Sequence, residues 1–188
     1  ALIGSAPSSV ALAPYDDPTW TIWPCSPGAR PHVKRCDAWF EIHLFEPNQP
    51  WFAPEYVNFM AGLKCPVYML EHIPVIPTSV PYPKDAMLAK YGPFFFTSSL
   101  AWMFALALEE NPDEIGLFGV DMSAAEEIYT GQRAGCHFFI HEAMKRGIKV
   151  TVPFQSDLMR PNPLYGFCEQ DHLHQKMLAR EAELRQRL

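Results

Sequence analysis

The second half of the chain alternates between helical and extended patterns, and no other feature of the sequence constrains the fold as strongly. Residues 100–108 are an apolar run of good helix formers that follows the hydroxyl side chains of residues 97–99. Residues 114–121 are a short apolar stretch ending in Gly-Val-Asp, which is typical of a strand buried on both faces. Residues 134–146 have helical spacing and a basic last turn, and a glycine separates them from the β-branched run at 148–153. The pattern predicts helix, strand, helix and strand in that order.

The first half of the chain repeats this alternation with longer loops, because it holds most of the 19 prolines. Its extended patterns predict strands at residues 1–3, 20–23, 38–43 and 66–70, with a short helix at 54–63. Strands that alternate with helices form a mainly parallel sheet with right-handed crossovers. We therefore expect an α/β fold, an open and mainly parallel Rossmann-like sheet flanked by helices, with a C-terminal helix.

The last part of the chain is more charged than the rest, and it predicts a tail. We expect residues 1–153 to form a Rossmann-like nucleotide-binding domain, and residues 154–188 to form a C-terminal loop and helical tail that packs on it or extends from it. Within the tail, residues 171–188 are charged and helical, with an interrupted apolar stripe on one face. The stripe fits a surface helix docked on the domain, and it also fits a contact that forms a homo-oligomer.

Composition excludes several classes of protein. With 48% hydrophobic and 13% aromatic residues, the chain is too apolar for a disordered protein, and we expect no membrane span. Fifteen Lys and Arg against 21 Asp and Glu give a net charge of −6, which disfavours indiscriminate binding to nucleic acids. The five cysteines are odd in number and form no Cys-x-x-Cys pair, which argues against a disulfide scaffold or a zinc ribbon. Together with the lack of a basic segment typical of a signal peptide, they predict a cytoplasmic protein.

A loop suited to a phosphate follows the first predicted strand. Residues 4–9 read Gly-Ser-Ala-Pro-Ser-Ser, and ligands of open α/β sheets bind at the carboxyl ends of the strands. Gly4 and Ala6 permit close approach of the backbone, and the serine hydroxyls can donate to a phosphate. The loop has neither the Walker A pattern nor Gly-x-Gly-x-x-Gly, so a plain strand-to-helix turn capped by serine is the alternative.

Four short motifs, taken in order, resemble those of a known family. Gly-Ser-Ala-Pro-Ser at residues 4–8 follows the first strand, Cys-Ser at 25–26 follows the second, Thr-Ser-Ser at 97–99 opens the buried helix, and Gly-Val-Asp at 119–121 ends the next strand. This order resembles the small bacterial sialyltransferases and the glycosyltransferase-like proteins of domain-of-unknown-function family 115. In those families the loops read roughly Gly-Asn-Gly-Pro-Ser, Cys-Asn, Thr-Ser-Gly and Gly-Ile/Val-Asp, and they surround a nucleotide. The donor of the sialyltransferases is a cytidine nucleotide-sugar.

The resemblance implies site residues, although the chain departs from the family pattern. Ser5 and Ser26 stand in place of the two family asparagines, and Ser99 stands in place of the glycine. The nucleotide-binding residues that the resemblance implies are Gly4, Ser5, Pro7, Ser8, Cys25, Ser26, Ser98, Ser99, Gly119, Asp121 and Met122. It also implies a catalytic histidine late in the chain, whose nearest counterpart is His137, and a tyrosine near the leaving phosphate, whose counterpart is Tyr129. The nucleotide-sugar is a substrate, so no bound cofactor is expected.

A second group of polar residues lies in the segment Cys-Asp-Ala-Trp-Phe-Glu-Ile-His at residues 36–43. On a strand, Asp37, Trp39, Glu41 and His43 share one face, because side chains alternate with period two. A Glu-His pair at this spacing can share a proton and act as acid and base. A solvated edge strand is the alternative. The catalytic candidates are therefore His43, Glu41 and His137.

The residues after Asp121 supply candidates for a leaving-group site. We expect Tyr129, Gln132 and Arg133 in the loop there, where they can stabilise a departing phosphate without a metal; for Arg133, surface charge at the start of a helix is the alternative. The histidines at 137 and 141 have the i, i+4 spacing of a helical metal pair. No third ligand follows them, so we expect no metal site.

These patterns predict a metal-independent, nucleotide-sugar-dependent enzyme of the glycosyltransferase kind, with its acceptor left open. One alternative is a non-catalytic module that senses or sequesters a nucleotide. Another is a transferase that acts on nucleic-acid bases, which needs a local basic patch of the kind that Arg30, Lys34 and Arg35 could form.

Overall fold

All strands in the described part of the chain are parallel. The computed structural model describes residues 1–47, 49–122, 127–159, 181 and 185 of the chain. One sheet has the order β2-β1-β6-β7, and its strands are β1 (Leu2–Ile3), β2 (Trp23–Pro24), β6 (Glu114–Phe118) and β7 (Lys149–Thr151). The other has the order β3-β4-β5, with β3 (Trp39–Phe40), β4 (Val67–Met69) and β5 (Ser79–Pro81). A parallel bridge between Cys25 and Phe40 links the two sheets. The predicted α/β class with an open parallel sheet is confirmed.

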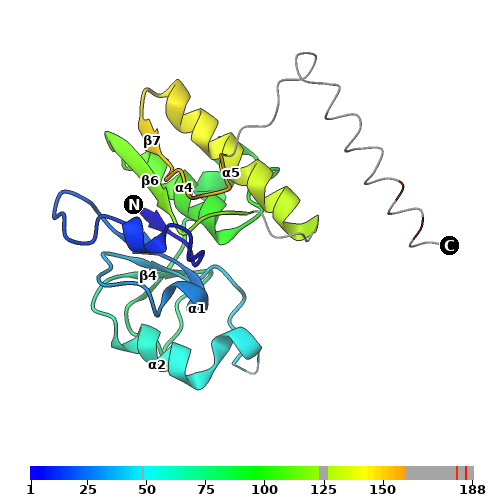
Figure 1. The fold of residues 1–188 in the computed structure, drawn as a ribbon. Helices are drawn as coiled ribbons and strands as arrows, with labels where there is room; N and C mark the ends of the chain where they lie inside the picture. Colours follow the sequence, from blue (N-terminus) through cyan, green and yellow to red (C-terminus); the bar gives the residue numbers. More distant parts are fainter. Residues whose placement is uncertain (48, 123–126, 160–180, 182–184, 186–188) are drawn as a thin grey trace, which may run out of the picture. The chain divides into compact units, whose positions relative to one another are not determined.

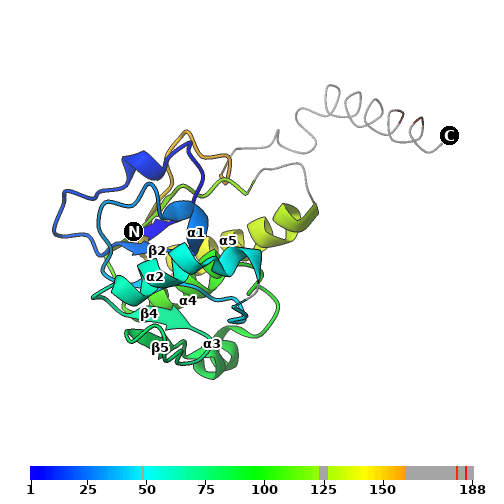
Figure 2. The ribbon, with the colours of Figure 1, turned by 90° about the horizontal axis from the view of Figure 1, so that it is seen from below.

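Helices connect these strands. They are α1 (Ser26–Ala29), α2 (Pro54–Gly62), α3 (Lys84–Tyr91), α4 (Ser99–Glu109) and α5 (Glu127–Lys145), with 3-10 turns η1 (Val10–Leu12) and η2 (Pro50–Phe52). Figure 1 shows β6, β7, α4 and α5 together, and Figure 2 shows the same unit with α2 and β4 in front. Sequence reasoning missed β5 and α3. It also started α5 at residue 134, so Tyr129, Gln132 and Arg133 belong to a helix and not to the predicted loop.

Side chains that follow one another on a strand enter different cores, which shows that the sheet is covered on both faces. On β1, Leu2 packs with α4 and α5, while Ile3 packs with η1 and Phe118. On β3, Phe40 joins the α4 core, while Trp39 packs against α2. Both faces are therefore apolar, as expected for parallel strands.

Helix α4 lies in the largest core because it is apolar on nearly all sides. Eight of its eleven residues are buried, and the side chain of Ser98 caps its first turn by accepting from the Ala101 N–H at 3.3 Å. The capping serine ends the preceding loop and leaves the start of the helix at the carboxyl edge of the sheet.

Residues beyond the sheet form a separate part. Ala1–Leu158 is one compact unit and Met159–Leu188 is another. The predicted tail helix at 171–188 lies outside the described residues, apart from Glu181 and Arg185, whose side chains form an ion pair at 2.7 Å. Among the helices of the described residues, none is long and apolar enough to cross a membrane.

Candidate functional site

The strand order reverses at one point, between β1 and β6. From β1 the chain runs outward through β2, β3, β4 and β5, and it then returns to place β6 on the other side of β1. In open α/β sheets, ligands bind outside the carboxyl ends of the strands at such a point. The loops after β1 and β6 meet there, since the Gly4 N–H donates to the Phe118 carbonyl and the Ala6 N–H to the Gly119 carbonyl, both at 2.8 Å.

Two glycines allow these loops to touch. A Cβ atom on Gly4 would lie 2.3 Å from the Gly119 carbonyl oxygen, and one on Gly119 would lie 2.7 Å from the Gly4 carbonyl oxygen. Gly119 also has a φ of +68°, which side chains with a Cβ rarely adopt. Both positions therefore require glycine.

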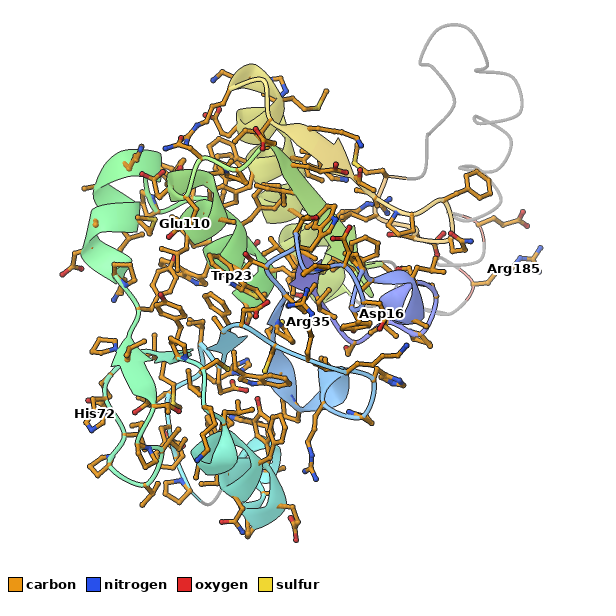
Figure 3. The ribbon with its side chains drawn as sticks, turned by 90° about the vertical axis from the view of Figure 1, so that its left-hand side faces the viewer. Asp16, Trp23, Arg35, His72, Glu110 and Arg185 are labelled. Carbon is orange, nitrogen blue, oxygen red and sulfur yellow. The ribbon has the colours of Figure 1, made fainter. Side chains whose placement is uncertain are left out.

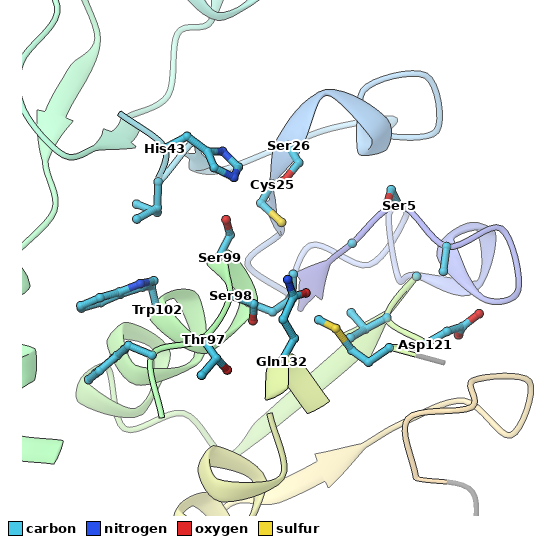
Figure 4. Close-up of a pocket in the computed structure, with 18 of the residues that line it drawn as sticks. Ser5, Cys25, Ser26, His43, Thr97, Ser98, Ser99, Trp102, Asp121 and Gln132 are labelled. Carbon is cyan, nitrogen blue, oxygen red and sulfur yellow. The ribbon is translucent and has the colours of Figure 1, made fainter. Parts of the chain in front are cut away.

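A cavity of about 760 Å³ opens at this place (Figure 4). The predicted site residues that line it are Gly4, Ser5, Pro7, Cys25, Ser26, His43, Ser98, Ser99, Gly119, Asp121, Met122 and Gln132. The four motif segments therefore line one space together with His43 and Gln132. Ser8, Glu41, Arg133 and His137 do not line it, and the side chain of Tyr129 lies outside the described residues.

Part of the wall consists of donors of hydrogen bonds. The start of α4, at Ser98 and Ser99, lines the cavity, and the first turn of a helix leaves backbone N–H groups without intrahelical acceptors. Such a helix start favours an anion or a partial negative charge. The hydroxyls of Ser5 and Ser26 add to this wall.

Strained backbone gathers at the same wall. Among the described residues, three that are not glycine have positive φ, and two of them, Ser26 at +68° and Met122 at +52°, line the cavity. Each such residue costs about 1–3 kcal/mol, and such strain is concentrated at ligand sites in proteins generally.

Glu41 and His43 form the main titratable pair of the site. The Glu41 side chain is fully buried, and its carboxylate accepts from the His43 Nδ1 atom through Oε1 and from the Tyr56 hydroxyl through Oε2 at 2.6 Å. The Trp39 Nε1–H donates to the same Tyr56 hydroxyl at 2.9 Å. With Nδ1 bonded to the carboxylate, Nε2 of His43 is the ring nitrogen left for a ligand.

The environment shifts the pKa values of this group. The hydrogen bond to Glu41 raises the pKa of His43 above its ordinary value, and burial only partly opposes this effect. Burial, followed by the charge of Glu41, raises the pKa of Tyr56 and keeps its hydroxyl protonated as a donor. The network therefore orients a histidine whose pKa lies above that of a free side chain.

Asp121 is held by residues behind the cavity wall. The Ser8 hydroxyl donates to its Oδ1 atom at 2.7 Å, and the Ser9 hydroxyl accepts from the Gly119 N–H at 2.9 Å. Ser8, predicted to bind the nucleotide, thus contacts Asp121 and not the cavity. One carboxylate oxygen of Asp121 is engaged in this way, and the carboxylate lines the cavity.

Two further predicted residues face another part of the unit. The Arg133 guanidinium donates to the carbonyl oxygens of Asp157 and Leu158, the latter at 2.9 Å, and the Nε2 atom of His137 lies 2.8 Å from the Leu158 carbonyl oxygen. Arg133 and His137 lie one helical turn apart on α5, so they share the face of the helix that contacts residues 157–158. Gln132 lines the cavity instead.

Sequence reasoning missed an aromatic part of the wall. Phe96 and Trp102 both line the cavity, and their rings stack with centroids 3.9 Å apart. Ile42 lies beside His43 on the same lining. Three consecutive phenylalanines at 94–96, directly before the Thr-Ser-Ser motif, were the available signal.

The residues of the predicted basic patch are engaged within the fold. Arg35, which is labelled in Figure 3, donates to the carbonyl oxygens of Tyr15, Asp17 and Trp20 and pairs with Asp37 at 2.7 Å. The Arg30 guanidinium lies over the ring of Phe59, and the Lys34 amine lies over the ring of Tyr15. These three cations therefore do not line the cavity.

No three His, Cys, Asp or Glu side chains lie close enough together to form a metal site within residues 1–47, 49–122 and 127–159.

The chain shows an α/β fold with two parallel sheets and a cavity at the point where the strand order reverses. No protein-family model matches the sequence, and neither a curated protein nor a solved structure is significantly similar to it.

Proposed function

We propose that this protein is a transferase that moves a glycosyl group from a nucleotide-linked donor to an acceptor hydroxyl, without a metal. The observation that carries the proposal is His43 on the cavity wall, with Nδ1 bonded to a buried carboxylate. A buried carboxylate that orients a histidine is the arrangement used to prepare a general base. The motif order that resembles the sialyltransferases supports the choice of donor.

In this proposal the donor nucleotide occupies the polar end of the cavity. The Asp121 carboxylate accepts from ribose hydroxyls, and the start of α4 receives the phosphate. The described lining residues include no lysine or arginine, so the phosphate charge meets N–H and O–H donors such as those of Ser98, Ser99 and Gln132. The nucleotide is therefore held by dipoles and hydrogen bonds.

The acceptor occupies the aromatic end, next to His43. The stacked Phe96 and Trp102 rings offer an apolar surface on which the face of a sugar ring can lie. Nε2 of His43 takes the proton of the acceptor hydroxyl, and the oxygen attacks the anomeric carbon of the donor. The bond between that carbon and the phosphate oxygen breaks, and the nucleotide leaves with the electron pair.

Turnover of nucleotide-sugars by matched histidine variants tests this proposal. In His43→Ala, we expect donor hydrolysis or transfer to fall by about 10²–10⁴-fold, while nucleotide affinity changes by less than about tenfold. His141→Ala is the control, because His141 is exposed on α5 and does not line the cavity. His137→Ala tests the other predicted base, and we expect it to keep its turnover.

Two outcomes would overturn the assignment. Full turnover by His43→Ala would mean that another group is the base. A wild-type protein that binds nucleotide-sugars but neither hydrolyses nor transfers them, across a broad panel of acceptors, would point to a sensing or sequestering module.

A further inference from the structure

Two cysteines lie next to each other at the start of neighbouring strands. The Sγ atoms of Cys36 and Cys65 are 3.5 Å apart, although the residues are 29 positions apart in sequence. Both thiols are free and both side chains are partly exposed. Cys36 precedes β3 and Cys65 precedes β4, on the side of the strands away from the cavity.

The pairing of β3 with β4 brings the two cysteines together. Trp39 of β3 is in register with Val67 of β4, and the Trp39 N–H donates to the Pro66 carbonyl at 2.8 Å. The segments that precede the two strands, which carry Cys36 and Cys65, therefore run next to each other. Sulfurs that lie 3.5 Å apart need to approach by about 1.5 Å to reach the disulfide bond length of about 2.05 Å.

The other described thiols differ from this pair. Cys25 and Cys136 are 2% and 1% exposed, whereas Cys36 and Cys65 are both partly exposed. An oxidant in solution therefore reaches the pair more readily than it reaches the two buried thiols.

We propose that Cys36 and Cys65 are a reversible modification site at which oxidation forms a disulfide between the segments that precede β3 and β4. The proposal does not depend on the function proposed above. A single reversible pair is compatible with a reducing compartment, where disulfides are transient and serve redox sensing.

The oxidant we name is a small disulfide such as oxidised glutathione. The Cys65 thiolate attacks one of its sulfurs, forms a mixed disulfide and releases one glutathione thiol. Cys36, whose sulfur lies beside that of Cys65, then loses its proton to solvent and attacks the Cys65 sulfur. The second glutathione leaves as a thiol, so two protein thiols are oxidised and one disulfide is reduced to two thiols.

The bond would enclose the segment that carries the histidine pair. Residues 36–65 contain β3, Glu41, His43, Tyr56 and α2. A disulfide that closes a loop of this length restricts the unfolded chain. We therefore expect the oxidised protein to melt about 5–10 °C higher than the reduced protein.

Alkylation and mass spectrometry of the whole chain test the proposal. The protein is incubated in glutathione buffers of increasing oxidised fraction, remaining thiols are blocked with iodoacetamide, and peptides are mapped. We expect a single cross-link joining Cys36 to Cys65, reversed by dithiothreitol, with the melting temperature raised. Cys36→Ser must abolish the cross-link and the shift, whereas Cys168→Ser, the matched control, must keep both.

Wild-type protein alone is enough to contradict the proposal. Alkylation of both Cys36 and Cys65 in wild-type protein at every ratio overturns the proposal. So does a cross-link that involves another cysteine or a second chain, or glutathione adducts that stay unresolved on these two residues.

Discussion

The Tyr56 hydroxyl donates a hydrogen bond of 2.6 Å to Oε2 of Glu41, and both side chains are buried. The other oxygen of that carboxylate is hydrogen-bonded to His43, so a helix residue that does not line the cavity helps to hold a residue that does. The charge of the carboxylate is stabilised inside the core by these two partners. The position of His43 thus depends on α2 as well as on the segment that follows β3.

Glu41→Gln should lower the pKa of His43. The hydrogen bond that His43 donates to the carboxylate is the largest cause of its raised pKa, and the amide oxygen of a glutamine accepts without carrying a charge. Titration of the histidine ring by NMR measures this directly, with the exposed His141 as the internal control. A His43 pKa that stays unchanged would show that Glu41 does not control it.

Tyr56→Phe should destabilise the fold by about 1–3 kcal/mol, because it leaves one oxygen of a buried carboxylate without its donor. Urea denaturation measures the change in the free energy of unfolding. Tyr68→Phe is the control: Tyr68 is half-buried and its ring stacks on Phe40, so the same atom is removed outside the network. Equal losses in both variants would argue against a role for the hydrogen bond.

The stability of the protein should depend on pH through His43. Its folded-state pKa is raised above 6.5, so its contribution to stability is fully present below that pH and is lost as the pH rises through the folded value. The side chain is 48% exposed, so solvent screening keeps the contribution small. We expect the difference in unfolding free energy between wild type and His43→Ala to shrink as the pH rises above 6.5 and through the folded-state pKa. A constant difference would refute this linkage.

Gly4→Ala should destabilise the protein by about 2 kcal/mol or more, because its Cβ would overlap the Gly119 carbonyl oxygen. Gly131→Ala is the matched control: it lies on α5 with open space around its Cβ, and alanine favours a helix by about 1 kcal/mol. Thermal unfolding should show opposite shifts for the two variants. A tolerated Gly4→Ala would contradict the close contact of the two loops.

Ser99→Leu should weaken nucleotide binding while the fold stays intact, because a bulky side chain would fill the cavity at the start of α4. Calorimetry with nucleoside monophosphates and nucleotide-sugars measures the affinity, and circular dichroism checks the fold. We expect binding by the wild type to survive a chelator. Unchanged binding in the variant would place the nucleotide elsewhere, and binding lost with the chelator would show that a metal takes part.

Local patterns predicted most of the sheet, and the exceptions have physical reasons. β6 and β7 each follow a clear helix end and are mostly apolar or β-branched, so their sequence alone indicates strands, and β6 is buried at four of its five residues. β5 reads Ser-Val-Pro and ends in a proline, so it lacks the apolar run of a typical strand. Helix α5 contains glycines at 131 and 135, and glycine disfavours a helix, so the sequence pattern did not indicate its first turns. In the structure, Gly135 allows the helix to approach the Phe95 carbonyl.

The sequence by itself determined the α/β class, the loops that line the cavity and the shared face of Trp39 and Glu41, because these follow from chain order and from the period of a strand. Only the tertiary structure decided what those side chains contact. Tyr56 reaches Glu41 from another element, and Cys36 meets Cys65 through the pairing of β3 with β4. Such contacts depend on how elements pack against one another, which no local pattern contains.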